Sequence, residues 1–144
     1  MEEATFIRAP AAVPQQPVLK GKIKSAPAVV RTLENHYFSS VAFETANAAA
    51  SLCIETGAMC EAQKYNEKVT HCLCIAREDE TSPDRVLSPC WICQERLRYW
   101  GEDVKVGVTA PGGELLFVTL GELQPHHWTA AYDAGELEHF REKD

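Results

Sequence analysis

Two cysteine motifs, Cys53-Ile54-Glu55 and Pro89-Cys90-Trp91-Ile92-Cys93, limit the folds open to this chain more than any other feature of the sequence. Three thiolates can bind one tetrahedral zinc ion and leave its fourth position to water. For that, two segments about 35 residues apart must meet in the folded chain. A Cys-x-x-Cys motif alone would say little, but both motifs in this order indicate one shared metal site.

Glu55 lies two residues after Cys53 and therefore beside any water that the metal would hold. Zinc lowers the pKa of a bound water from near 15.7 to about 7, which makes hydroxide available at neutral pH. A carboxylate in that place can accept the water proton and pass it on, first as general base and then as general acid. We therefore predict Cys53, Cys90 and Cys93 as metal ligands and Glu55 as the proton-transfer residue.

Pro89 predicts that Cys90 and Cys93 lie in the first turn of a helix, because proline suits the first helical position. The positive end of the helix dipole also stabilises thiolates there. For the same reason we expect Cys53 to open another helix, within the helical pattern over 51–64.

Two other interpretations of the cysteines remain open from the sequence. In a structural zinc site, Cys60, Cys72 or Cys74 would supply a fourth thiolate. Cys60 is disfavoured, since it lies seven residues after Cys53, or about 10 Å along a helix. The Cys-x-x-Cys pair could also be a thioredoxin-like redox motif, but such a motif leaves the first cysteine and its glutamate unexplained.

The length and charge of the chain exclude several partners. Its 144 residues suffice for one domain with a substantial core, and its formal net charge is −7. This charge, without any Lys/Arg cluster, argues against a nucleic-acid partner. No apolar stretch reaches the roughly eighteen residues that span a bilayer, so no membrane partner is expected. With Glu2 and Glu3 at its start the chain lacks a signal peptide pattern, and six cysteines then favour a reducing, cytoplasmic location.

The pattern along the chain predicts an arm and one domain. Residues 1–24 contain Pro10, Pro14 and Pro17 and are expected to form an extended N-terminal arm, followed by a zinc domain over 25–144. Strands are expected at 26–32, 37–43, 69–76, 104–109 and 115–118. Helices are expected at 51–64, 90–100, 120–123 and 134–143. Strands that alternate with helices indicate an α/β layered domain.

The two cysteine motifs resemble those of the small zinc-dependent cytidine deaminases, in the branch with three cysteine ligands and homotetrameric assembly. The resemblance runs from about Ala26 to Trp128, with Ser88 through Cys93 matching the family's Ser-Pro-Cys-x-x-Cys. It implies a three-layer α/β/α fold with a mixed five-stranded sheet. It also implies a Zn²⁺ cofactor and a small-molecule substrate, a cytidine-type nucleoside that is converted to its uridine counterpart with release of ammonia.

The resemblance also implies contacts to the substrate. Glu44, nine residues before Cys53, corresponds to the family's ribose-binding glutamate, and Phe43 beside it is positioned to stack on a base or sugar. The backbone amide of Ile54 is expected to face the base carbonyl. Trp128 occupies the aromatic position that reaches a neighbouring subunit's pocket. The family's C-terminal segment is matched by Thr119, Glu122, Leu123 and Pro125.

The sequence departs from the family at two places near the pocket. Ala42 stands where the family has a ribose-binding asparagine, and Thr56 stands where arginine follows the catalytic glutamate. Three thiolates and one Zn²⁺ leave one net negative charge, which raises the pKa of a bound water unless donors compensate it. Arg96, one turn past Cys93, is the best-placed cation for that task.

These departures keep two further functions open. Ala42 favours a sister deaminase that acts on a modified cytosine nucleoside or a nucleoside antibiotic like blasticidin S, because a lost asparagine opens space and removes a ribose hydrogen bond. A catalytically retired zinc scaffold is the third possibility. The retention of Glu55 argues against it, because a site kept only for structure has no use for a proton-transfer residue.

Overall fold

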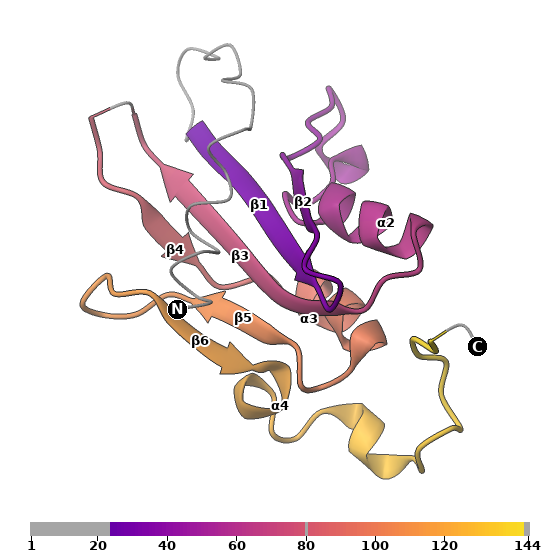
Figure 1. Ribbon diagram of the computed structural model, residues 1–144. Helices are drawn as coiled ribbons and strands as arrows, with labels where there is room; N and C mark the ends of the chain where they lie inside the picture. Colours follow the sequence, from indigo (N-terminus) through magenta and orange to yellow (C-terminus); the bar gives the residue numbers. More distant parts are fainter. Residues whose placement is uncertain (1–23, 80, 143–144) are drawn as a thin grey trace.

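The computed structural model describes residues 24–79 and 81–142, and in them one mixed sheet forms the centre of the domain (Figure 1). Its strands are β1 (Lys24–Thr32), β2 (Tyr37–Ser40), β3 (Val69–Arg77), β4 (Arg85–Leu87), β5 (Lys105–Val108) and β6 (Leu116–Thr119). The order is β2-β1-β3-β5-β6, with β4 paired to β3 beside this path. β3 and β5 run parallel and the other pairs antiparallel. The predicted α/β class with a mixed sheet is confirmed, and the short β4 adds a strand that the sequence patterns did not predict.

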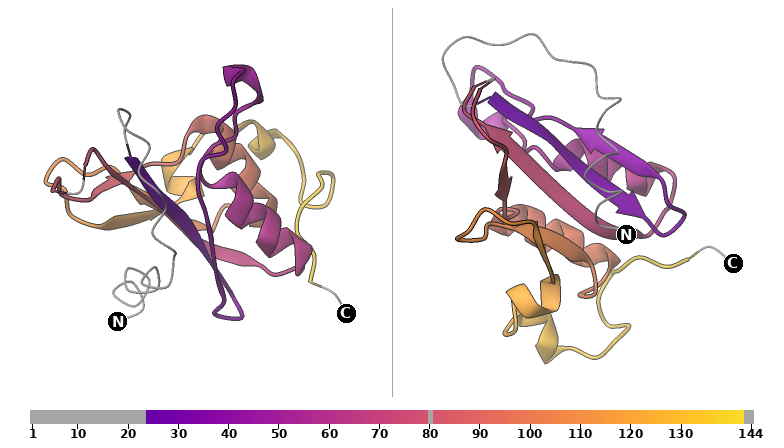
Figure 2. Two further views of the ribbon diagram at one scale, coloured as in Figure 1. Left: turned by 90° about the horizontal axis from the view of Figure 1, so that it is seen from above. Right: turned by 60° about the vertical axis from the view of Figure 1, so that its left-hand side comes forward.

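Within residues 24–79 and 81–142, the helices that pack on this sheet lie on one face of it (Figure 2). The α-helices are α2 (Thr56–Lys64), α3 (Trp91–Leu97) and α4 (Leu120–Leu123), and the short 3₁₀ helices are η2 (Ala48–Ala50), η3 (Arg98–Trp100) and η4 (Trp128–Ala131). Helices α2 and α3 form one of the two helical layers expected from the resemblance. None of the helices in the described part of the chain is long and apolar enough to cross a membrane. The predicted N-terminal arm lies outside the described residues except for Lys24, which belongs to β1.

The main core fills the space between the sheet and helices α2 and α3. Along β3, side chains alternate between the two faces, so Cys72 points into this core while Leu73 packs on the opposite face with Val29. His71 also lies on that opposite face, edge-on to Phe117. Cys72 therefore belongs to the main core and His71 does not.

Helix α2 begins at Thr56, so the prediction that Cys53 opens this helix is wrong. The reason is a β-bridge between Phe43 and Leu52, in which each backbone N–H donates to the other residue's carbonyl, at 3.3 and 2.9 Å. The bridge holds the chain extended up to Cys53. Gly57 then allows α2 to lie close against β2, because a Cβ atom there would come within 2.8 Å of a β2 side chain.

The helix predicted at 134–143 is absent from the part of it that the structure describes, 134–142. This segment turns at Gly135, whose φ of 104° lies in the left-handed region. A short polar segment gains little from helix formation without an apolar face to bury. Instead, the Phe140 amide donates to the Tyr99 carbonyl at 2.6 Å, and the two rings pack edge to face.

The half-buried carboxylate of Glu67 links the sheet to the loop after α2. It accepts a hydrogen bond from the Thr32 hydroxyl at 2.6 Å and pairs with His36 Nδ1 at 2.8 Å. Burial raises the pKa of Glu67, but the hydrogen bonds from Thr32 and His36 outweigh it, so this pKa lies below its ordinary value. A depressed pKa contributes stability that is present above the unfolded-state value of about 4.3 and is lost as the pH falls through the folded-state value.

We therefore expect Thr32→Val to lower the free energy of unfolding by about 1 kcal/mol at pH 7, and by less at pH 3. Chemical denaturation at the two pH values measures the difference. Thr45→Val is the matched control, because the Thr45 hydroxyl donates to the Asn47 carbonyl, which does not titrate. An equal loss of stability at both pH values in Thr32→Val would contradict the role given to Glu67.

Candidate metal centre and active site

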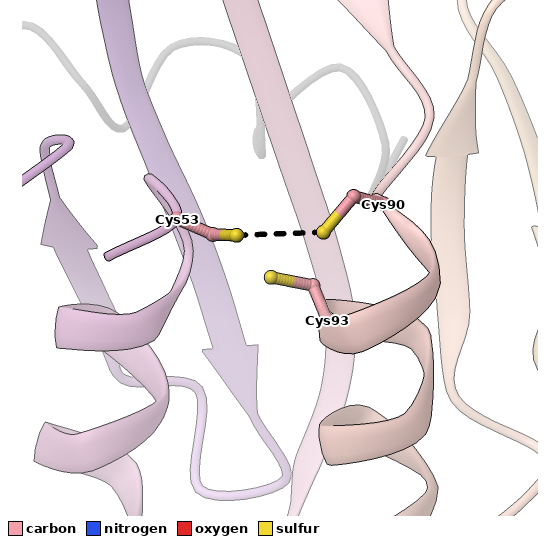
Figure 3. A group of neighbouring side chains, drawn as sticks. All are labelled: Cys53, Cys90 and Cys93. Atoms are coloured by element: carbon pink, nitrogen blue, oxygen red, sulfur yellow. Dashed lines mark hydrogen bonds between the residues drawn. The ribbon is translucent and has the colours of Figure 1, made fainter. Parts of the chain in front are cut away.

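The three cysteines predicted as metal ligands lie together, with their side chains pointing toward one another from the turn before α2 and the start of α3 (Figure 3). Their Sγ atoms all lie within 4.8 Å of one another, and those of Cys53 and Cys90 are 3.4 Å apart. Zinc–sulfur bonds of about 2.3 Å place the sulfurs of a tetrahedral site roughly 3.8 Å apart. The spacing of the thiols therefore fits one metal ion, and three sulfur donors suit zinc.

Cys90 is the N-cap residue of α3. Burial raises the pKa of its thiol, but hydrogen bonds from the backbone amides of Cys93 and Ile92 and from the neighbouring thiols outweigh this, so its pKa lies below the ordinary value. The helix start thus favours the thiolate form of Cys90, as expected from its position in the sequence.

Glu55 lies directly beside the thiol cluster and is only 3% exposed. The Cys93 thiol donates to Glu55 Oε2 at 3.2 Å. Burial, followed by the negative charge of Glu55, raises the pKa of Cys93, and the hydrogen bond with Cys90 is the main cause that raises the pKa of Cys53. A metal that binds here must displace thiol protons, so metal binding and proton release are coupled.

Cys72 and Cys74 are buried thiols that do not belong to the cluster of Cys53, Cys90 and Cys93. Burial raises the pKa of Cys74 to about 12 and that of Cys72 well above its ordinary value, with the charge of Glu55 as the next cause of both shifts. Both therefore remain neutral thiols in the core. Cys60 is exposed on α2, and the metal-binding group within the described residues does not include it. The structural site with four cysteines is thus not supported by the geometry.

Two polar contacts that the sequence analysis missed hold the loop before Cys90. The Ser88 and Thr109 side chains each accept a hydrogen bond from the other residue's backbone amide, at 2.9 and 3.2 Å. The Gln94 side chain, 6% exposed, donates to the Pro89 carbonyl at 2.7 Å. Among the described residues, Gln94 Oε1 is the buried side-chain polar atom without a hydrogen-bond partner. The only sequence signal for this support of the loop by Gln94 was its place as a polar residue directly after Cys93.

Arg96 reaches from α3 to the start of α2. Its Nη1 donates to the Thr56 hydroxyl at 3.0 Å, next to Glu55 in the chain. Arg96, the cation predicted from the sequence, therefore lies at the edge of the site. It contacts Thr56, which stands in the place of the family's arginine. That Arg96 offsets the charge of the thiolates remains a hypothesis.

The residues predicted to contact the substrate lie in two separate parts of the structure. Because Phe43 is bridged to Leu52, residues 42–44 run alongside the segment that leads into Cys53, with Phe43 60% exposed. The Ile54 carbonyl accepts a hydrogen bond from the Ser40 hydroxyl at 2.5 Å, which orients the turn that carries Glu55. Ala42, Phe43, Glu44 and Ile54 therefore lie on the Cys53 side of the site. Trp128 is instead joined to Glu95 of α3, at 3.0 Å from its indole nitrogen.

This α/β domain has a mixed sheet, and three thiols and a buried carboxylate lie together at the starts of two of its helices. Such an arrangement is typical of zinc deaminase-like domains. Known structures agree with this class. The chain is 47% identical to the cytidine deaminase from Bacillus anthracis, with a TM-score of 0.73 over 76% of this chain and 79% of that one. The chain belongs to the cytidine deaminase family.

Two more distant structures share the fold. The cytidine deaminase from Burkholderia pseudomallei is 18% identical, with a TM-score of 0.65 over 89% of this chain and 99% of that one. The enzyme from Mycobacterium tuberculosis is 20% identical, with a TM-score of 0.57 over 88% of this chain and 92% of that one. No protein-family model matches the chain.

Proposed function

We propose that this protein is a zinc-dependent hydrolytic deaminase that converts a cytidine-type nucleoside to its uridine counterpart and releases ammonia. The observation that carries the proposal is the contact between the thiol cluster and the buried Glu55, which joins a metal site to a proton-transfer group. The 47% identity to a cytidine deaminase supports the same reaction.

Cys53, Cys90 and Cys93 would hold the metal. When bound, zinc supplies the Lewis acidity that makes water a nucleophile at neutral pH. Glu55 would accept one proton of the attacking water and deliver it to the ring nitrogen of the base. It would then move the remaining hydroxyl proton to the departing amine as the C–N bond breaks, which leaves the carbonyl and ammonia. Its burial keeps bulk water from competing for those protons.

The residues around the turn before α2 would orient the nucleoside. Glu44 binds a ribose hydroxyl, Phe43 stacks on the base or sugar, and the Ile54 amide donates to the base carbonyl. The geometry supports this set, because the bridge between residues 43 and 52 brings the first two residues alongside the segment that contains the third. Trp128 would reach the pocket of a neighbouring subunit in a homotetramer.

We also propose a cellular setting for this reaction. All six cysteines are free thiols, which suits a reducing compartment, and we place the protein in the cytoplasm. Its role there would be pyrimidine salvage. A free nucleoside is favoured over a polynucleotide, because the net charge of −7 repels phosphates.

Ala42 keeps one other substrate class open, a modified cytosine nucleoside or a nucleoside antibiotic such as blasticidin S, although the similar proteins of known structure are cytidine deaminases. Alanine offers no side-chain amide to a ribose, and the exposed Phe43 next to it leaves apolar surface for a bulkier group. A retired scaffold is disfavoured, because the buried Glu55 contacts the thiols and has no structural task that a neutral residue could not perform.

Ammonia release by the zinc-loaded protein on a panel of substrates tests the proposal. The panel contains cytidine, deoxycytidine, cytosine, cytidine monophosphate, N4- and C5-modified cytidines, adenosine and blasticidin S. We expect turnover of cytidine or deoxycytidine, and a lower KM for cytidine in Ala42→Asn, by about fivefold for one regained hydrogen bond. Turnover confined to the modified compounds would establish the sister deaminase instead. Silence on the whole panel would favour the scaffold.

A further inference from the structure

The C-terminal segment after α4 has little regular structure, yet it is tied to one helical stretch of the domain, α3 with η3 (Figure 1). Glu95 binds His127 and Trp128, Arg98 donates to the side chain and carbonyl of Gln124, and the Tyr99 carbonyl accepts from the Phe140 amide. The same α3 carries Cys90 and Cys93 at its start. The position of the segment is thereby linked to that of the metal ligands.

Glu95 uses both carboxylate oxygens in this link. Oε2 lies 2.6 Å from His127 Nε2, and Oε1 accepts from the Trp128 indole N–H at 3.0 Å. The Thr129 backbone amide donates to His127 Nδ1 at 3.4 Å, and the Thr129 hydroxyl lies 2.8 Å from the same nitrogen. The His127 side chain is only 8% exposed. This arrangement holds the backbone next to Trp128 in one position.

The Trp128 ring is 54% exposed although its single polar atom is already bonded within the domain. What it presents outward is therefore apolar ring surface alone. Tyr132 packs against it edge to face, with centroids 5.8 Å apart, and is also half exposed. An aromatic surface that is held rigidly and left uncovered is typical of a binding surface, because little conformational entropy is lost when a partner covers it.

We propose that Glu95 is a positioning residue that fixes the Trp128 ring relative to α3, so that the ring is preorganised for the substrate pocket of a second copy of this chain. The proposal rests on the proposed function, in which Trp128 completes a neighbouring pocket. Glutamine in place of Glu95 removes the carboxylate charge and replaces one acceptor oxygen with an amide NH2 group, so the pair of bonds to His127 and Trp128 is weakened.

A double-mutant cycle with Glu95→Gln and Trp128→Ala tests this positioning. We expect the KM for the nucleoside substrate to rise about fivefold in Glu95→Gln and about tenfold in Trp128→Ala, with kcat within about twofold of the wild type. The double variant should resemble Trp128→Ala alone, since Glu95 has nothing left to position. Glu61→Gln is the matched control, because Glu61 is a similarly exposed helical glutamate that pairs with Lys64, and it should leave KM unchanged.

Two further measurements separate positioning from folding and from metal loss. Zinc content should be equal in all variants. The Trp128 indole N–H signal in NMR should exchange slowly with solvent in the wild type and rapidly in Glu95→Gln. If the wild type turns over its substrate and Glu95→Gln has an unchanged KM, or if the two effects add, the positioning role is overturned while the proposed function stands. If the wild type turns over no nucleoside of the panel, the proposed function falls and this inference falls with it.

Discussion

Replacing Glu55 with glutamine is expected to reduce turnover by roughly 10²–10⁴-fold while zinc binding and folding persist, because general acid–base catalysis contributes about that much. Glutamine has nearly the same shape and can still accept a hydrogen bond from the Cys93 thiol, which now donates to Glu55 at 3.2 Å. It cannot take up the water proton or release one to the amine. Ammonia release, zinc content and a thermal melt on the same sample separate these effects.

The matched control for that experiment is Glu67→Gln, which changes another largely buried carboxylate, one that accepts a hydrogen bond from the Thr32 hydroxyl. We expect Glu67→Gln to lower the melting temperature but to leave kcat/KM within about twofold, since Glu67 belongs to the network of Thr32 and His36. If Glu55→Gln kept more than a tenth of wild-type turnover, Glu55 would not be the proton-transfer residue. If it also lost zinc, its role would be to support the metal.

Removing one thiol of the cluster is expected to have a still larger effect on activity. Turnover by Cys93→Ser should fall below detection. Its zinc affinity should also fall by more than roughly 10–100-fold, which is the loss that follows removal of a residue that only supports a metal ligand. Cys93 is buried between Cys53, Cys90 and Glu55, so a shorter hydroxyl there can neither reach the metal as well nor replace a soft ligand. Zinc titration with a colorimetric competitor measures the change in affinity.

The same experiment has a stability readout, because a ligand that binds only the folded state raises the melting temperature by mass action. Wild-type protein should melt at a higher temperature with zinc than after treatment with a chelator, and Cys93→Ser should show little difference between the two conditions. Cys60→Ser is the control, since Cys60 is an exposed thiol on α2 outside the cluster. Equal zinc binding in the wild type and Cys93→Ser would show that the cluster is not the metal site.

The chemistry of the site could be predicted from the sequence because it depends on residue types at short spacing. Cys53 and Glu55 are two residues apart and Cys90 and Cys93 are three apart, so each pair is local and needs only a turn to orient it. The alternation of side chains along β3 is local in the same way, since Cys72 faces the core and His71 does not. Five of the six strands in the described part of the sheet followed from the same short-range patterns, and β4 did not.

The tertiary structure alone decided where these local units begin and what supports them. α2 starts at Thr56 and not at Ser51, because the bridge from Phe43 to Leu52 overrides the helical preference of residues 51–55. The expected C-terminal helix gives way to a segment held to η3, where the Phe140 amide donates to the Tyr99 carbonyl. Each of these outcomes depends on partners about ten or more residues away, and local propensity contains no information about such partners. The sequence by itself thus determined which residues can carry the chemistry, and long-range contacts determined how the fold holds them in place.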